Sequence, residues 1–252
     1  MNLRLLTVLP VYNEVEHVSG VIAGTLNYCR EVLVVDDGST DGTAGLLAAR
    51  KDIRLLSHPQ NRGYGAALRS AFDYAIAGGY EILVTIDCDG QHQPQLIPNL
   101  VELCVGENAD MASGSRYLRQ FPGDSQPPEA RRRINRLLTE EINRRLGLHL
   151  TDAFCGFKAY RVGALTGLHL TEPGYAMPLE LWVQAARLGW KIVELPVPLI
   201  YLDETRSFGG ALDDAETRLA VYRQVLDRVG KQGGMVEGGG RKRQNCKMKN
   251  EN

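Results

Sequence analysis

The stretch Glu81–Pro94, EILVTIDCDGQHQP, indicates what kind of fold the chain adopts. Its first part, Ile82–Ile86, is a short apolar run rich in β-branched residues, which is typical of a strand buried on both faces of a sheet. The run ends in Asp87-Cys88-Asp89. Ligands of α/β sheets bind just beyond the carboxyl ends of strands, and two carboxylates one residue apart repel each other unless a cation lies between them. The stretch therefore predicts a central strand that ends in a divalent-metal site, suited to an anionic ligand such as a diphosphate.

The residues around the two aspartates favour a metal site over a simple turn. A helix N-cap accounts for most Asp-x-Asp pairs, but here Gly90 lets the backbone approach a ligand and Gln91 offers an amide oxygen to a hard cation. A hard cation prefers oxygen to sulfur, so we expect Cys88 to contribute only its backbone or a packed side chain. The predicted metal ligands are Asp87, Asp89 and Gln91.

The segments on either side alternate between strand and helix patterns. Before this stretch we expect strands at Leu3–Leu9, Glu31–Val35 and Ile53–Ser57 and helices at Val15–Cys29, Ala44–Arg50 and Ala66–Ala77. After it we expect helices at Gln95–Val105, Glu129–Leu146, Glu180–Leu188 and Asp214–Val229, and strands at Asp110–Ser113, Lys191–Leu195 and Val197–Tyr201. We expect Pro10 to close the first strand and Pro196 to separate the last two. This alternation predicts βαβ units and a mostly parallel sheet.

The composition is that of a globular enzyme domain followed by a tail. The 252 residues are 44% hydrophobic and 23% charged. A net charge of −1 gives no general attraction to nucleic acid, and we expect no such partner. The five cysteines are odd in number and contain no C-x-x-C pair, which favours a reducing, cytoplasmic setting. We expect a single domain at residues 1–230 and a disordered, basic tail at residues 231–252.

The sequence predicts at most a peripheral contact with membranes. Met1–Arg4 leads directly into a strand pattern, without the features of a signal peptide. No stretch reaches the roughly 18 consecutive apolar residues that span a bilayer. The basic tail could attract anionic lipid, but a simply solvated tail fits its composition equally well.

Two further loops follow strands and can face the same crevice. Asp36 and Asp37 end the second strand, where their carboxylates suit hydroxyl or ring N–H donors of a nucleoside. Asp41, a few residues on, suits the cap of the next helix. After the first strand, Tyr12 offers a ring that can stack on a base, and Glu14 offers a carboxylate for a sugar or base N–H.

Six motifs in this order resemble the family 2 glycosyltransferases of the GT-A fold, particularly the branch of dolichol- and polyprenyl-phosphate sugar transferases. They are PVYNE (Pro10–Glu14), VVDDGSTDGT (Val34–Thr43), NRGYGAA (Asn61–Ala67), DCDGQHQP (Asp87–Pro94), GSRY (Gly114–Tyr117) and TDAFCGFKAYR (Thr151–Arg161). The resemblance spans most of residues 3–201. It implies an α/β fold of the GT-A type, with a Rossmann-like, mostly parallel but mixed sheet flanked by helices. It also implies a GDP- or UDP-sugar donor and a Mg²⁺ or Mn²⁺ ion.

The resemblance assigns roles to individual residues. The nucleoside positions match Pro10, Tyr12, Glu14, Val35 and Asp37, and the metal and diphosphate positions match Asp87, Cys88, Asp89 and Gln91. Arg116 matches an arginine near the donor diphosphate or the acceptor phosphate, and Arg131 and Asn135 match contacts to a lipid phosphate. The sequence departs from this branch at Tyr201–Asp214, which has Arg206 as a candidate donor contact but lacks the usual lysine.

The implied reaction is a metal-dependent, inverting sugar transfer, most simply onto a polyprenyl or dolichyl phosphate. A lipid phosphate is already an anionic nucleophile, whereas a saccharide hydroxyl needs a general base. The candidate bases are Asp152 and, second, Glu180, while Arg116 could stabilise the leaving diphosphate. The alternatives are a saccharide acceptor, a non-catalytic nucleotide-sugar binding module and a haloacid-dehalogenase-like phosphatase, whose nucleophile strand also ends in D-x-D-G.

Overall fold

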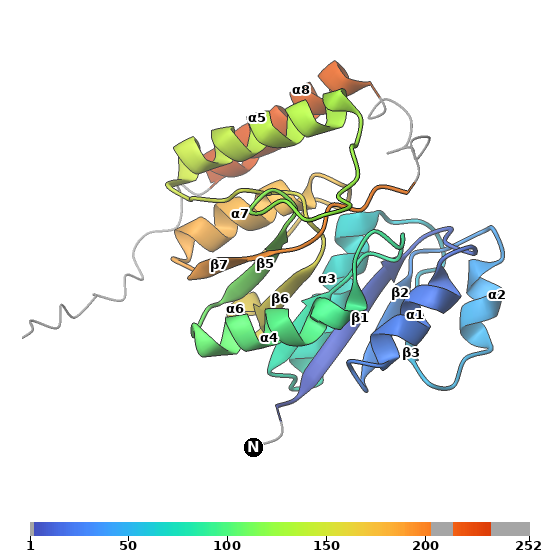
Figure 1. Ribbon diagram of the computed structural model, residues 1–252. Coiled ribbons are helices and arrows are strands. Elements are labelled where there is room, and N and C mark those ends of the chain that lie inside the picture. The colour runs from blue at the N-terminus through green and yellow to red at the C-terminus, as the bar shows by residue number, and fades with distance from the viewer. Residues whose placement is uncertain (1–2, 203–213, 233–252) are drawn as a thin grey trace, which may run out of the picture.

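The computed structural model describes residues 3–202 and 214–232, which form one seven-stranded sheet with helices on both faces (Figure 1). The strands are β1 (Leu5–Val11), β2 (Val32–Asp36), β3 (Arg54–Ser57), β4 (Ile82–Thr85), β5 (Met111–Ser115), β6 (Lys158–Arg161) and β7 (Ile192–Pro196). Their order is β3-β2-β1-β4-β6-β5-β7. Only β6 runs against its neighbours, so the expected mostly parallel, mixed sheet is confirmed.

The helices form one layer on one face of the sheet and two on the other. They are α1 (Val18–Leu26), α2 (Thr43–Ala48), α3 (Tyr64–Ala77), α4 (Ile97–Gly106), α5 (Glu129–Leu146), α6 (Val162–Leu165), α7 (Met177–Arg187) and α8 (Ala215–Gln232), with a 3₁₀ turn at Pro94–Leu96. Helices α1, α2 and α4 share one core. Helices α3, α6 and α7 share the other, and α5 and α8 lie side by side on α7 as an outer layer (Figure 1).

Alternate residues of the central strands fill the two cores. In β1, Leu6 and Val8 pack on the α3 side, whereas Leu9 and Val11 pack on the α1 side. Because successive side chains of a strand point to opposite faces, a strand covered by helices on both faces needs apolar residues throughout. The unbroken apolar runs of the sequence follow from this.

Two prolines fall inside strands that the sequence analysis ended earlier. Pro10 lies within β1, where the N–H that proline lacks would point toward β4. The last ladder bond on that side runs from Ile86 N to Val8 O, so the ladder with β4 ends just before Pro10. Pro196 is the last residue of β7, an edge strand, where proline is tolerated.

Other differences are local. Residues 197–202 continue without regular secondary structure, so the predicted strand Val197–Tyr201 was wrong. Helix α6 was missed, and α8 reaches Gln232, just past the expected domain boundary. Residues 233–252 of the expected tail lie outside the described residues, as does Arg206. Within the described ranges, none of the helices has the length and apolar composition that crossing a bilayer requires.

Candidate active site

The carboxyl ends of the parallel strands open onto a cleft of about 950 Å³. The loops after β1, β2, β4 and β5 reach this cleft, as does the segment before β6, because β6 runs in the opposite direction. The sequence-predicted site residues that line it are Pro10, Tyr12, Glu14, Asp37, Asp87, Cys88, Asp89, Gln91, Arg116, Arg131 and Asn135. Val35 was expected to contact the nucleoside, but its side chain is fully buried in the core.

The Asp87 carboxylate is held on three sides. The Tyr64 hydroxyl donates to Oδ1 over 3.0 Å, and His92 Nε2 lies 3.5 Å from Oδ2. A Cβ atom on Gly156 would lie 2.0 Å from Oδ2, so only glycine fits beneath the carboxylate. Burial acts to raise the pKa of Asp87, but the contacts from His92 and Tyr64 outweigh it and lower that pKa. The Asp87 carboxylate is therefore ionised and held in a fixed orientation.

The rest of the DCDGQ loop forms a tight turn. Asp89 Oδ1 accepts a hydrogen bond from Gln91 N over 3.0 Å, and the turn passes through Gly90 at a φ of +73°. Asp89 and Gln91 are half-buried at the cleft. Cys88 is buried and packs in the core with Ile97, as expected for a thiol that a hard cation would not bind.

A buried lysine in the cleft was missed by the sequence analysis. Lys158 opens β6, and its Nζ donates to the carbonyl oxygen of Cys155 and lies 5.5 Å from the Trp182 ring centre. Burial lowers the pKa of Lys158, while the nearby carboxylates of Asp152 and Asp87 act to raise it. The signal was present in the motif GFKAY, in which a lysine stands inside an apolar run that predicts a buried strand.

The end of the cleft next to β2 is assembled from three loops. Asp37 accepts hydrogen bonds from the backbone amides of Arg62 and Gly63, the shortest of 2.7 Å, and from His58. Asn13, at a φ of 55°, receives a hydrogen bond from Thr40 N over 2.8 Å and ties the first loop to the second.

The cap position that we expected for Asp41 is taken by Gly42, which has no side-chain cap bond, and Asp41 instead supports the helix start from one residue earlier. Asp41 Oδ1 accepts from Thr43 N over 3.0 Å, at the start of α2, and its Oδ2 accepts from Val15 N over 3.1 Å. Asp41 thus serves the local structure of the loop.

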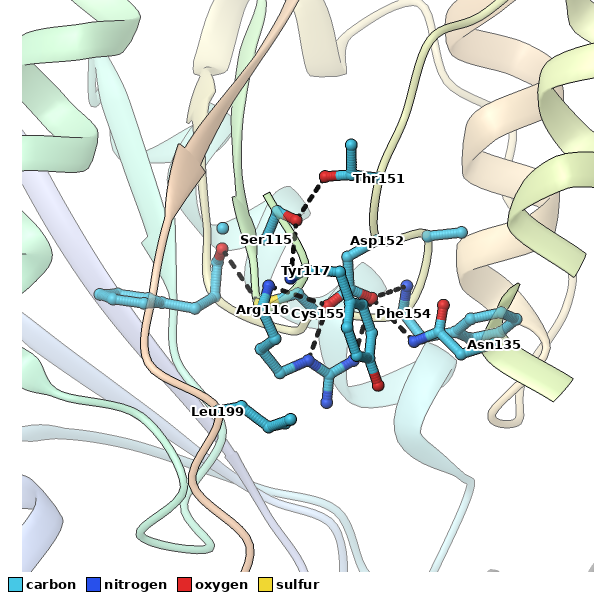
Figure 2. A network of polar contacts seen from close by, with 12 residues as sticks. Ser115, Arg116, Tyr117, Asn135, Thr151, Asp152, Phe154, Cys155 and Leu199 are labelled. Atoms are coloured by element: carbon cyan, nitrogen blue, oxygen red, sulfur yellow. Dashed lines mark hydrogen bonds and ion pairs between the residues drawn. The ribbon is translucent and has the colours of Figure 1, made fainter. Parts of the chain in front are cut away.

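At the other end of the cleft, Arg116 and Asp152 form a buried ion pair (Figure 2). Arg116 Nε and Nη2 donate to the two carboxylate oxygens over 2.6 and 3.0 Å. Asn135 Nδ2 and Phe154 N donate to Oδ1 over 2.9 and 3.1 Å. Figure 2 shows these groups converging on the carboxylate from β5, α5 and the loop before β6.

The ion pair corrects the expected role of Asp152 as a general base. Burial acts to raise its pKa, but Arg116 and Asn135 lower the pKa of Asp152 to about 2. The carboxylate is fully buried and lies outside the set of residues that line the cleft. A group with so low a pKa and without access to substrate is a poor base. Asp152 instead orients Arg116, whose own pKa it raises well above the usual range.

The second candidate base, Glu180, is also occupied elsewhere. Its carboxylate is buried and accepts from Thr171 N and Glu172 N over 2.8 and 2.7 Å, and from the Thr171 hydroxyl over 3.0 Å. These bonds anchor residues 171–172 to α7, so Glu180 has a structural role.

The expected phosphate contacts on α5 differ from each other. Arg131 lines the cleft with its guanidinium carbon 5.3 Å from the Tyr201 ring centre. Asn135 lines the cleft too, but it donates to Asp152 and accepts from Thr139 over 3.0 Å. Asn135 is thus a support of the ion pair, whereas Arg131 lies at the cleft beside Tyr201.

Comparisons with known proteins agree on one family. The profile of glycosyl transferase family 2 matches residues 7–168. Polyprenol monophosphomannose synthase from Mycolicibacterium smegmatis is 34% identical over 242 residues, with 90% of each chain covered. Undecaprenyl-phosphate mannosyltransferase from Micrococcus luteus is 33% identical over 226 residues, 84% of this chain and 91% of that protein.

Solved structures support the fold. Glucosyl-3-phosphoglycerate synthase from Mycobacterium tuberculosis, crystallised with uridine diphosphate, has a TM-score of 0.69 at 24% identity and covers 94% of this chain and 83% of its own. Another structure of that enzyme holds Mn²⁺ and uridine diphosphate, with a TM-score of 0.67 at 23% identity. The family match leaves the phosphatase and the non-catalytic module without support. The chain belongs to glycosyl transferase family 2 and is a glycosyltransferase of the GT-A fold.

Proposed function

We propose that this protein is a metal-dependent, inverting glycosyltransferase that moves a sugar from a GDP- or UDP-sugar to a polyprenyl phosphate. The observation that carries the proposal is the arrangement of one cleft. The loops with Tyr12 and Asp37 lie at one end, the aspartates Asp87 and Asp89 follow β4, and Arg116 lies at the other end. A nucleoside, a diphosphate and an anionic acceptor would find suitable partners in that order.

The donor set of the DCDGQ loop fits a hard divalent cation. Asp87 is ionised because its pKa is lowered, and Asp89 and Gln91 add further oxygen atoms at the cleft. Among the residues that the structure describes, no group of three or more His, Cys, Asp or Glu side chains is arranged to hold a metal. A Mg²⁺ ion shared with substrate phosphates needs only one or two carboxylates. When bound, the ion would neutralise charge on the leaving nucleoside diphosphate.

Neither Asp152 nor Glu180 is suited to act as a general base, and this favours an acceptor that is already anionic. Both carboxylates are buried and engaged in hydrogen bonds. A saccharide hydroxyl would need a base to remove its proton, whereas a phosphate oxygen can attack the anomeric carbon directly. One relative is named undecaprenyl-phosphate mannosyltransferase and the other polyprenol monophosphomannose synthase, and both names agree with this choice.

Arg116 and Arg131 would orient the acceptor phosphate. Asp152 engages Nε and Nη2 of Arg116, and the remaining nitrogen, Nη1, has no hydrogen-bond partner among the described residues. The Asp152 carboxylate therefore fixes the plane of the guanidinium and directs Nη1 to a ligand. Tyr117 and Leu118, next in the chain, are exposed and apolar, and would face the prenyl chain or a membrane surface in peripheral docking.

The test is a transfer assay with radiolabelled GDP- and UDP-sugars and a short polyprenyl phosphate, with and without Mn²⁺. We expect glycolipid to form only with the metal and to fall at least 100-fold in the variant Asp89→Asn. The matched control is Asp73→Asn, an exposed aspartate of α3, which should transfer at the wild-type rate. Full activity in EDTA would exclude the metal, and transfer to free saccharides alone would exclude the lipid acceptor.

A further inference from the structure

A buried chain of polar contacts lies behind Asp37, among residues that do not line the cleft. His58 Nδ1 lies 2.6 Å from Asp37 Oδ1, and His58 Nε2 lies 2.9 Å from the Ser70 hydroxyl oxygen. His58 is 6% exposed and Asp37 2%. His58 directly follows β3 and Ser70 lies in α3, so the contacts join two further elements to the end of β2.

Hydrogen-bond chemistry sets the direction of each contact. An ionised carboxylate only accepts, so His58 Nδ1 carries the hydrogen and donates to Asp37. In a neutral imidazole the other nitrogen is then an acceptor, and Ser70 can donate its hydroxyl hydrogen to Nε2. Ser70 thus selects the tautomer of His58 that Asp37 requires.

The number of donors around Asp37 leaves room for a ligand. An ionised carboxylate offers about four acceptor positions. Among the described residues, three N–H groups donate to it: the His58 ring to Oδ1, the Gly63 amide to Oδ2, and the Arg62 amide to both oxygens as one shared hydrogen, so three hydrogens serve four positions. The position that this sharing leaves without a hydrogen of its own suits one more N–H donor from the cleft, which Asp37 lines. Uracil and guanine both carry a ring N–H of this kind.

We propose that His58 is a positioning residue for the nucleoside of the sugar donor. It holds the Asp37 carboxylate in the rotation that presents the remaining acceptor position to the base, and Ser70 holds His58. The inference rests on the proposed nucleotide-sugar donor and adds to it a determinant of base recognition. His58 is the one side chain among the three described donors, so it is the contact that a substitution can remove without altering the main chain.

The experiment uses four variants and a probe that isolates the nucleoside end. The dissociation constants of UMP and GMP are measured by calorimetry without metal or acceptor. His58→Phe removes both ring contacts. For whichever nucleotide the wild type binds, we expect this variant to have a dissociation constant at least tenfold higher. His58→Asn keeps a donor near the place of Nδ1 and should recover most of the affinity. Ser70→Ala should weaken nucleotide binding a few-fold. The control His169→Asn, at an exposed histidine, should leave the dissociation constant unchanged.

Turnover measurements separate positioning from a general effect on the fold. We expect His58→Phe to raise the KM for the donor far more than it lowers kcat, since the reacting groups lie elsewhere in the cleft. The inference would be overturned if folded His58→Phe bound the nucleotide as tightly as the wild type does. It would also be overturned if His58→Asn had the same melting temperature as the wild type but did not recover the affinity. If the wild type itself binds neither nucleotide, the proposed function fails instead, so the two failures are distinguishable.

Discussion

Burial alone would make Asp152 harder to ionise, yet Arg116 lowers its pKa to about 2. The two groups depend on each other, because removing one partner of a buried pair leaves a charge without compensation, at a cost of about 3–5 kcal/mol. Asn135 and the backbone amides of Phe154 and Arg116 donate further hydrogen bonds to the carboxylate. The pair therefore connects the end of β5 to the loop before β6. It also holds the Arg116 guanidinium in place at the cleft.

The ion pair predicts a specific dependence of stability on pH. The pKa of Asp152 is lower in the folded state than in the unfolded state, so its stabilisation is full above about pH 4 and is lost as the pH falls toward 2. The loss amounts to roughly 2 kcal/mol. Urea unfolding of wild type and Asp152→Asn, compared at each pH, isolates this group from other acids. The difference in unfolding free energy should shrink over that range, and a constant difference down to pH 2 would contradict the prediction.

Tyr64 is the residue that holds Asp87 from the side of α3. Its hydroxyl donates to the carboxylate over 3.0 Å, so Tyr64→Phe removes one hydrogen bond to an ionised acceptor. We expect the pKa of Asp87 to rise and the affinity for Mn²⁺ in the presence of nucleoside diphosphate to fall about tenfold, equivalent to about 1.4 kcal/mol. Titration of Mn²⁺ by electron paramagnetic resonance measures this. Tyr28→Phe, at an exposed tyrosine, is the matched control; equal losses in both variants would refute a role for the Tyr64 hydroxyl.

At the scale of elements, the start of α3 depends on close contact between two backbones. A Cβ atom on Gly65 would lie 2.4 Å from the carbonyl oxygen of Glu172, and Ala66 N donates to the carbonyl oxygen of Pro173 over 3.1 Å. The NRGYG loop, which supplies the amides around Asp37, is thereby fixed to the segment that Glu180 anchors. The end of the cleft that contains Asp37 is therefore secured by residues more than a hundred positions away from α3.

Two glycine substitutions, one at this contact and one away from it, are expected to change the free energy of unfolding in opposite directions. Gly65→Ala forces a backbone shift and should lower the unfolding free energy by about 1–3 kcal/mol, together with nucleotide affinity. Gly45→Ala, in α2, meets nothing within 4 Å and should raise stability by about 0.5–1 kcal/mol, because alanine is the better helix former. Chemical denaturation of the two variants gives the comparison. A neutral Gly65→Ala would show that the loop tolerates displacement.

The elements were predictable wherever their pattern was local. Helix α5 has the predicted ends, Glu129–Leu146, because its apolar stripe is long and Gly147 follows it in a left-handed conformation at a φ of +66°. The errors came from context. Pro10 lies inside β1 at the point where the ladder with β4 ends. Residues 197–202 have a strand-like composition, but Leu199 and Tyr201 bond to the loop residues Asp124 and Ser125 and not to a strand. Neither fact can be obtained from a single segment.

At the scale of the whole molecule, ligand binding should stabilise the folded state as a unit. A ligand at 100 times its dissociation constant adds about 2.7 kcal/mol, which corresponds to a rise of roughly 5–10 °C in the melting temperature of a domain of this size. We expect GDP or UDP with Mn²⁺ to produce that rise by differential scanning fluorimetry and the nucleotide with EDTA to produce much less. Asp89→Asn should abolish the contribution of the metal. No response to any nucleoside diphosphate would contradict a nucleotide-sugar donor.

Sequence reasoning found the residues of the cleft better than it found their roles. Loops after parallel strands must meet at one edge of the sheet, so Tyr12, Asp37 and Asp87 could be grouped without coordinates. Roles depend on neighbours from distant segments. The contact with Arg116 turns Asp152 from an expected base into a support. His58, which follows β3 as an ordinary histidine, becomes informative only once Asp37 is seen beside it.

The position of β6 also has a consequence for biosynthesis. This strand is translated after β5 but lies between β4 and β5 in the sheet. On a nascent chain β4 therefore keeps one edge of unpaired backbone groups until Lys158–Arg161 emerges, several seconds later at ~5–20 residues per second. An open apolar edge is a template for pairing with another chain. Ribosome-bound folding assistance should thus matter most during this interval, and fragments that stop before residue 161 should aggregate.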